Sequence, residues 1–286
     1  MPSLTTPVQL SPNLFIVYAE YPHHDSGNAY LITGRYPTLI DCGSQAAFPR
    51  LVKNLEQLGL EVQDLVQVVA THGDYDHVQG YHDLRREHPY LRLHIHRNDW
   101  PSVQGSDPYR NGSYIYNRPF QPIAAEQCLP LEEGGIIAVG DTTVRVHHTP
   151  GHTDGSVCLL GDIDGRHVLF AGDTVYGGMR SLDKAVLEIW VQAAATWKES
   201  LQRLTGLDFE WVLNGHEPVR SLPIGRARFD RAVASFGWML SPWFALDEEE
   251  LEYSPDGSAA VPVNAHDTSA GATASIQVDH DRGRRA

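Results

Sequence analysis

The chain has 286 residues, and 22 Lys and Arg stand against 36 Asp and Glu, which gives a formal net charge of −14. This acidic balance argues against a nucleic-acid surface and a polybasic membrane patch, because both need a local excess of Lys and Arg. No stretch approaches the roughly 18 apolar residues of a membrane span, and no apolar segment follows a basic N-terminal start. We therefore expect a cytoplasmic protein with neither a nucleic-acid nor a membrane partner.

The first half of the chain predicts an opening meander followed by alternating helices and strands. Short apolar runs rich in β-branched residues predict strands over 14–18, 29–33, 38–40, 65–70 and 91–96. The first three of these strands are expected to pair antiparallel. Apolar residues three and four apart predict a helix over 48–58, with Gly59 just after its end. A second helix is expected from Asp76 or His77 to just before Pro89.

The second half repeats this organisation after an irregular segment. Residues 97–127 are rich in Pro, Tyr, Asn and Gly without a clean period, which indicates an insertion or lid loop. Strands are then expected over 136–139, 143–148, 156–160, 167–171 and 209–213, and helices over 186–204 and 226–240. Two similar halves of mixed sheet plus helices predict an α/β fold, a four-layer αββα sandwich.

The chain therefore divides into a domain and a tail. We assign residues 1–245 to the sandwich. Residues 246–286 carry nine acidic and three basic side chains and few large apolar ones. That composition predicts a disordered acidic C-terminal tail.

Four polar clusters each follow a predicted strand and carry a glycine beside a potential metal ligand. They lie at 71–77, 150–153, 171–174 and 214–217. Glycine lets the backbone turn sharply, so that side chains can come close together. Histidine and carboxylate are the ligands that a divalent metal takes in a hydrolytic site. One such cluster is most simply a hydrogen-bonded surface or core feature, but four on one pattern predict a metal centre.

In their order, these clusters resemble the metallo-β-lactamase-fold hydrolase superfamily, whose pattern is HxHxDH followed by a His, an Asp and a last His. The matching residues are His72, Asp76, His77, His152, Asp173 and His216. The resemblance covers roughly residues 10–240 and implies a dinuclear metal site at the upper edge of the two sheets. Asp41 matches the acid that the family places beneath this site, where it supports the ligands.

One position departs from the pattern, because Asp74 stands where the second His is expected. Either this position has lost its ligand or a carboxylate replaces the imidazole. We favour the second interpretation, because an oxygen ligand suits Zn, Mn and Fe alike. The extra negative charge would weaken the attraction for anionic substrates and favour neutral ones.

The resemblance implies two divalent metal ions, zinc in the first place and manganese or iron as alternatives. Site 1 would comprise His72, Asp74 and His152, and site 2 would comprise Asp76, His77 and His216, with Asp173 as the bridge. A hydroxide held between the metals would attack the substrate, and Asp76 would orient it. Tyr176 lies near the offset at which lactonases of this superfamily place a phenol that hydrogen-bonds the substrate carbonyl. A tyrosine packed in a loop is the alternative.

We therefore expect a hydrolase of a small neutral lactone, ester or thioester, which could act as a homodimer. One alternative is a mononuclear iron enzyme that oxidises sulfur, resembling persulfide dioxygenases and using the site 1 positions. Another is a metal-free binding protein on the same fold. The segment expected to select the substrate, residues 97–127, contains no recognisable motif, so the sequence does not name the substrate.

Overall fold

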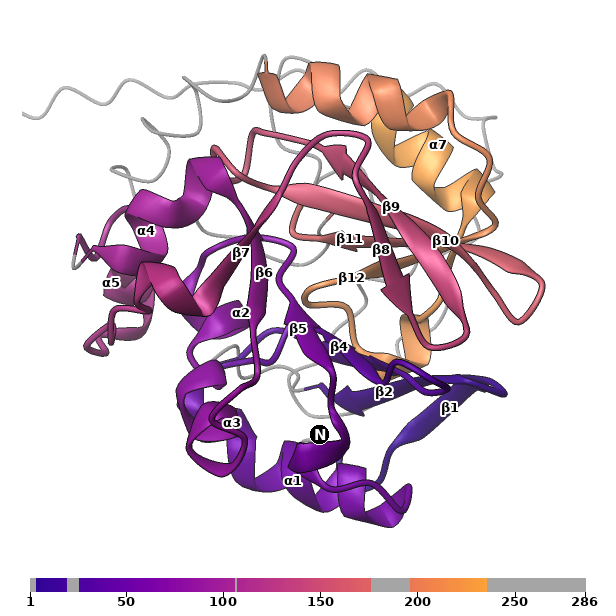
Figure 1. Ribbon diagram of the computed structural model, residues 1–286. Helices are drawn as coiled ribbons and strands as arrows, with labels where there is room; N and C mark the ends of the chain where they lie inside the picture. The colour runs from indigo at the N-terminus through magenta and orange to yellow at the C-terminus, as the bar shows by residue number, and fades with distance from the viewer. Residues whose placement is uncertain (1–3, 20–25, 106, 176–195, 236–286) are drawn as a thin grey trace, which may run out of the picture. The chain divides into compact units, whose positions relative to one another are not determined.

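Two β-sheets with helices on their outer faces form the body of the protein (Figure 1). The computed structural model describes residues 4–19, 26–105, 107–175 and 196–235. The chain separates into two units, Met1–Asp247 and Glu248–Ala286, and every described residue lies in the first. The predicted C-terminal tail lies outside the described residues, as do 186–195 and 236–240 of the predicted helices.

The first sheet has seven strands whose spatial order follows the chain. They are β1 (Val8–Ser11), β2 (Leu14–Tyr18), β3 (Ala29–Ile32), β4 (Thr38–Ile40), β5 (Gln67–Val69), β6 (Leu93–His96) and β7 (Cys128–Leu131). Strands β1 to β4 pair antiparallel, which confirms the predicted meander. Strands β4 to β7 pair parallel, so their carboxyl ends lie at the same edge of the sheet.

The second sheet has six strands in the order β13-β12-β11-β10-β9-β8. They are β8 (Ile136–Val139), β9 (Thr142–His148), β10 (Val157–Ile163), β11 (Arg166–Gly172), β12 (Trp211–Asn214) and β13 (Ile224–Gly225). Strands β8 to β11 form an antiparallel meander, whereas β11 and β12 pair parallel. The chain between these parallel strands includes a helix at 196–205.

Alternating side chains of the first sheet enter two different cores. Leu39 and Val68 face a core that also contains Leu51 and Leu55 of α1 (Phe48–Gln57). Their chain neighbours belong to a core shared with the second sheet, represented by Ile40 and Val69. This two-residue period is what a sheet buried on both faces requires.

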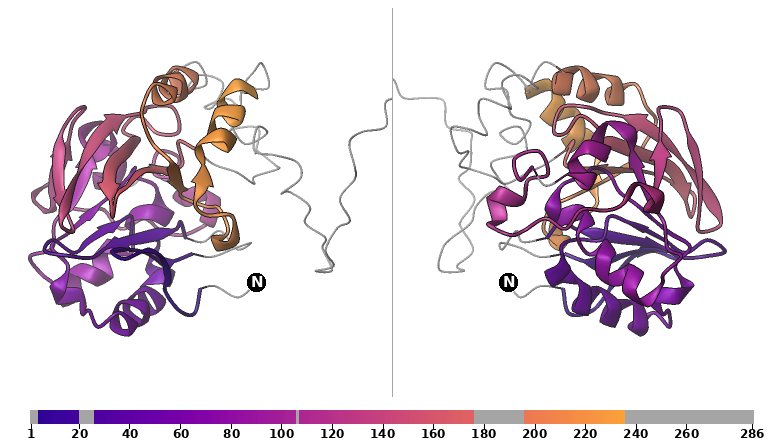
Figure 2. Two further views of the ribbon diagram at one scale, coloured as in Figure 1. Left: turned by 90° about the vertical axis from the view of Figure 1, so that its right-hand side faces the viewer. Right: turned by 60° about the vertical axis from the view of Figure 1, so that its left-hand side comes forward.

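Helices cover the outer faces of both sheets. Helices α1 and α3 (Tyr81–Glu87) lie against the first sheet, whereas the helix at 196–205 and α7 (Arg226–Ser235) lie against the second (Figures 1 and 2). Trp197 and Phe229 anchor the latter pair and are at most 1% exposed. The four layers confirm the predicted αββα sandwich.

The second predicted helix is interrupted, giving α2 (Tyr75–Val78) and α3. Backbone groups that would continue the helix bond neighbouring loops instead. The Asp76 carbonyl accepts a hydrogen bond from Gly27 N at 2.8 Å, and Gly80 N donates to the Gly43 carbonyl at 2.8 Å. These partners are distant in sequence, so a local helical pattern cannot reveal the break.

The described part of segment 97–127 contains two short α-helices, α4 (Trp100–Gln104) and α5 (Ser113–Tyr116). Each has at most five residues, too few to show a helical period in the sequence. Helix α5 is bounded by Gly112 and Asn117, both in the left-handed conformation. None of the helices in the described part of the chain combines the length and apolar character needed to cross a bilayer.

Candidate metal centre

Loops that follow four strands converge at one edge of the sandwich. The loop after β5 carries His72 and Asp74, and α2 continues it with Asp76 and His77. The other candidate ligands follow β9, β11 and β12 and are His152, Asp173 and His216. The structure therefore brings together all seven metal ligands that the sequence predicts.

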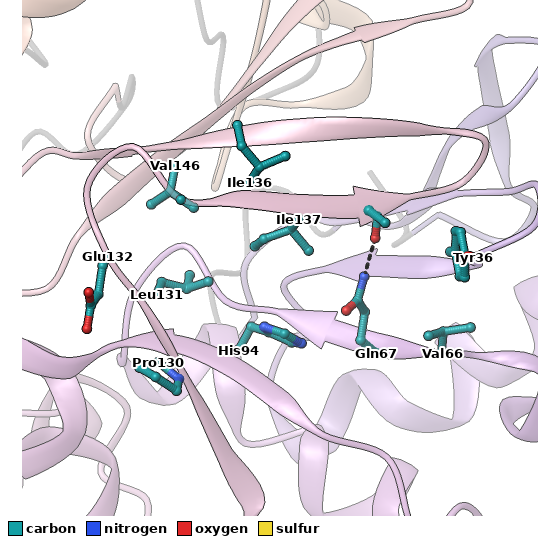
Figure 3. Close-up of a pocket in the computed structure, with 12 residues that line it drawn as sticks. Tyr36, Val66, Gln67, His94, Pro130, Leu131, Glu132, Ile136, Ile137 and Val146 are labelled. Carbon is teal, nitrogen blue, oxygen red and sulfur yellow. Dashed lines mark hydrogen bonds between the residues drawn. The ribbon is translucent and has the colours of Figure 1, made fainter.

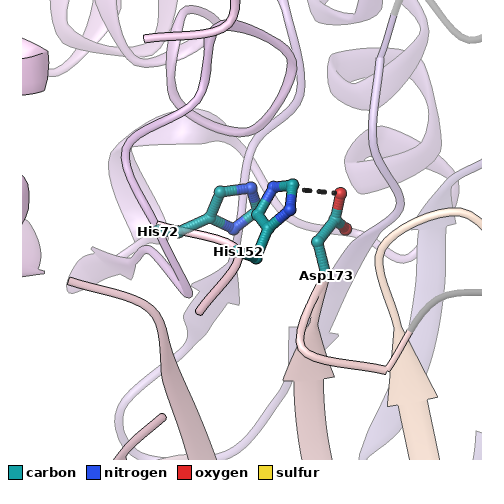
Figure 4. Close-up of side chains that lie close together, drawn as sticks. All are labelled: His72, His152 and Asp173. Atoms are coloured by element: carbon teal, nitrogen blue, oxygen red, sulfur yellow. Dashed lines mark ion pairs between the residues drawn. The ribbon is translucent and has the colours of Figure 1, made fainter. Parts of the chain in front are cut away.

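Two groups of three side chains could each hold a metal ion. The first is His72, His152 and Asp173, whose potential ligand atoms lie within 4.8 Å of one another (Figure 4). His152 Nε2 lies 3.6 Å from Asp173 Oδ2. The second group is Asp76, His77 and His216, with ligand atoms within the same limit.

Asp173 belongs to the first group and also contacts the second. Its Oδ2 is 3.1 Å from His216 Nε2, and its Oδ1 is 3.4 Å from His77 Nε2. The same carboxylate faces His152 of the first group. This is the placement that a bridging ligand between two metal ions requires.

Asp74 lies beside the first group. Its Oδ2 is 3.0 Å from His152 Nε2 and 3.7 Å from His72 Nε2. Gly112 of the 97–127 segment lies against it, because a Cβ added at this glycine would be 3.3 Å from Asp74 Cγ. The Asp74 carboxylate thus faces His72 and His152, the two histidines of the first group. A carboxylate that replaces an imidazole ligand requires this placement.

Tyr176, the second predicted catalytic residue, lies outside the described residues. Its predicted contact with the substrate carbonyl therefore stays a prediction. Tyr75, which follows Asp74 in the chain, stacks on Tyr116 with ring centroids 5.4 Å apart. This stack joins α2 to the 97–127 segment.

Asp41 supports the loop after β5 and the second group together. Its Oδ1 accepts a hydrogen bond from Thr71 N at 2.7 Å, and its Oδ2 accepts one from Thr71 Oγ1 at 2.8 Å. Asp41 Oδ2 also lies 2.9 Å from His77 Nδ1. A proton on Nδ1 leaves His77 Nε2, which faces the centre, as the atom with the lone pair.

Asn28 and Tyr30 support the loop that carries His216. Asn28 Nδ2 donates to the carbonyls of Asn214 and Glu217 at 3.2 and 3.0 Å, and Tyr30 Oη donates to the Asn214 carbonyl at 2.6 Å. Sequence reasoning did not identify either residue as part of the site. Their partners lie more than 180 residues along the chain, so no local pattern marks them.

Burial and neighbouring charges set the protonation of the ligands. Burial lowers the pKa of His72, and the neighbouring His77 lowers it further. Burial also opposes the charged form of His216, but the carboxylates of Asp173 and Asp76 outweigh this and raise its pKa to about 9. Burial raises the pKa of Asp173, but His216 and His77 outweigh it and hold this pKa well below its ordinary value.

The donor set fits a divalent cation. His72 Nε2 and Asp173 Oδ1 are buried and make no hydrogen bond. A neutral imidazole nitrogen and an ionised carboxylate oxygen, both withdrawn from water, are costly unless they have a partner. A cation in the first group would give His72 Nε2 a partner, and one in the second group would do so for Asp173 Oδ1, which faces His77 Nε2 at 3.4 Å.

Three other histidines, His94, His96 and His148, belong to neither group. His96 stacks on His148 with ring centroids 4.0 Å apart. His94 lines a separate cavity of about 450 Å³ between β5, β7 and β8, where burial lowers its pKa to about 4 (Figure 3). The lining of that cavity includes none of the seven candidate ligands.

The sequence of this chain matches the model of a known protein family. The model of the metallo-beta-lactamase superfamily matches residues 24–216, a range that contains all seven candidate ligands. The chain belongs to the metallo-beta-lactamase superfamily. A superfamily member from Bradyrhizobium japonicum, a subclass B3 metallo-beta-lactamase, superposes with a TM-score of 0.60 at 23% identity, covering 73% of this chain and 77% of that one. A beta-lactamase from Chitinophaga pinensis gives a TM-score of 0.64 at 19% identity, covering 82% and 92%.

Two curated relatives in the superfamily are named as thioesterases. The atrochrysone carboxyl ACP thioesterase of Passalora fulva is 28% identical over 232 residues, 78% of this chain and 59% of the relative. The acyl-coenzyme A thioesterase MBLAC2 of Homo sapiens is 31% identical over 123 residues, 38% of this chain and 41% of the relative. The chain thus spans less than two thirds of the length of either relative.

Gly215 tests the packing of the centre. A Cβ added there would collide with Asp173 Oδ1 and lie 2.7 Å from His77 Cε1, so Gly215→Ala must displace ligands of both groups. We expect at least about tenfold weaker zinc binding, measured by elemental analysis and chelator competition. The matched control is Gly225→Ala, whose added Cβ would meet no atom within 4 Å. Equal zinc binding by both variants would contradict the geometry.

Proposed function

We propose that this chain is a metal-dependent hydrolase and that its substrate is an acyl thioester. The observation that carries the proposal is the contact of Asp173 with two adjacent groups of metal ligands. The superfamily match supports a metallohydrolase. Among the three predicted substrate classes, the names of the relatives favour the thioester over the lactone and the ester.

The residues divide between two metal positions. The first would be held by His72, Asp74 and His152, the second by Asp76, His77 and His216, and Asp173 would contribute to both. Two divalent cations in this donor set, with zinc as the first choice, would activate a water molecule at neutral pH and polarise the thioester carbonyl.

The chain's own groups supply orientation and charge. The Asp76 carboxylate is 3% exposed, and its Oδ2 lies 3.1 Å from His216 Nε2. At this position the carboxylate can accept a proton and orient the attacking water. Three carboxylates, those of Asp74, Asp76 and Asp173, offset most of the charge of two divalent cations, which favours a reacting group that is itself neutral.

Several features of the proposal rest on the sequence alone. A role for Tyr176 at the substrate carbonyl, a homodimer and a cytoplasmic location stay predictions. So does the expectation that the partner is a small molecule and neither a nucleic acid nor a membrane.

Substrate class is tested with the purified chain on a panel of acyl thioesters, lactones, esters and phosphoesters. We expect thioester hydrolysis that is lost on treatment with a chelator and restored by zinc. Asp76→Asn is expected to lower turnover by about 10²-fold or more, because the general base is lost. Hydrolysis of lactones alone would contradict the thioester proposal. One iron per chain with oxygen consumption on a sulfur substrate would instead support the sulfur-oxidising alternative.

Asp74 is tested by two substitutions measured for zinc content. Asp74→His restores the family's imidazole, so we expect it to retain two zinc ions per chain. Asp74→Ala removes the donor that lies 3.0 Å from His152 Nε2, so we expect about 10- to 100-fold weaker binding of one zinc ion. Unchanged binding in Asp74→Ala would show that this carboxylate is not a ligand.

A further inference from the structure

A buried carboxylate outside the ligand set joins two of the ligand-bearing loops. This residue is Asp99, at the end of the 3-10 helix Arg97–Asp99 that follows β6, and its exposed fraction is 0%. We propose that Asp99 is a positioning residue that fixes the loop of His72 and Asp74 against the loop of His152. The inference rests on the proposed metal centre and concerns its first metal position.

Three hydrogen bonds connect Asp99 to these loops. Its Oδ2 accepts one from Gly73 N at 2.8 Å and one from Thr153 Oγ1 at 2.8 Å, and its Oδ1 accepts one from Gly155 N at 2.7 Å. Gly73 lies between His72 and Asp74, and Thr153 follows His152 directly. Each loop is therefore held one residue from a candidate ligand.

The two glycines allow the loops to lie directly on the Asp99 side chain. A Cβ added at Gly73 would be 3.2 Å from Asp99 Cβ, and one added at Gly155 would be 2.6 Å from Asp99 N. The absence of a side chain leaves room for the backbone N–H of each glycine beside the carboxylate, with the closer packing at Gly155. Hydrogen bonds to an ionised acceptor are also stronger than those between neutral groups.

The support that Asp99 provides differs from that of Asp41. Asp41 bonds Thr71 and His77. The hydrogen bonds that Asp99 accepts come from Gly73 in the loop of His72 and Asp74, and from Thr153 and Gly155 in the loop of His152. Removing the Asp99 carboxylate should therefore weaken the first metal position selectively. A residue that only stabilises the fold would weaken both positions together.

The test is zinc binding by Asp99→Asn, measured by competition with a chromophoric chelator. The amide has the shape of the carboxylate but replaces one acceptor with a donor, which would face an N–H or hydroxyl donor. We expect two zinc ions in the unchanged chain and about 10- to 100-fold weaker binding of one ion in the variant. Repeating the substitution in His216→Ala, which retains the first position, should weaken the remaining ion. Repeating it in His152→Ala, which retains the second, should not.

Asp164→Asn is the matched control. The Asp164 carboxylate also accepts three hydrogen bonds, from Ser11 Oγ, Asn13 N and Asn13 Nδ2 at 2.6 to 2.7 Å. These bonds join the turn between β10 and β11 to the turn between β1 and β2, and neither turn carries a candidate ligand. This variant should bind both zinc ions normally. Thr153→Val removes only one of the Asp99 bonds and gives a second, milder test should Asp99→Asn fail to fold.

The outcomes separate this inference from the proposed function. If the unchanged chain binds no zinc, the metal centre itself is wrong. If the chain binds two ions and both Asp99→Asn and Thr153→Val leave each affinity unchanged, the role of Asp99 is overturned. Equal weakening of both ions overturns it as well, because that result assigns Asp99 to general stability.

Discussion

Burial of charge at the edge of the two sheets is the constraint on which the rest of the structure depends. The carboxylates of Asp76 and Asp173 are 3% and 6% exposed, and His72 and His77 are at most 1% exposed. A carboxylate leaves water at low cost only where opposite charge or hydrogen-bond donors replace its hydration. The imidazole of His216 approaches both carboxylates at 3.1 Å, and divalent cations would partner the donor atoms that remain.

The first sheet supplies most of the polar groups that hold this arrangement. Asn28 directly precedes β3, which contains Tyr30, whereas Asp41 follows β4 and Asp99 follows β6. Each bonds the backbone of a loop that carries ligands on another strand. Ligand loops and supporting residues thus come from different strands of the sandwich, so the site forms only when both sheets are in place.

The sequence could predict the features that depend on neighbours along the chain. The period of three and four residues gives α1. The strand-glycine-ligand pattern, with the family resemblance, predicts the seven candidate ligands that the structure brings together. Features that depend on distant partners could not be found in this way. The break between α2 and α3 follows from bonds to Gly27 and Gly43, and the partners of Asp99 lie 26, 54 and 56 residues along the chain.

The central claim, that these side chains hold two adjacent metal ions, is tested most directly by anomalous diffraction from crystals of the zinc-loaded protein. We expect two anomalous peaks. One should lie about 2.0–2.2 Å from donor atoms of His72, Asp74 and His152, and the other at similar distances from Asp76, His77 and His216. Both peaks should contact Asp173. A single peak, or peaks away from these side chains, would contradict the dinuclear centre.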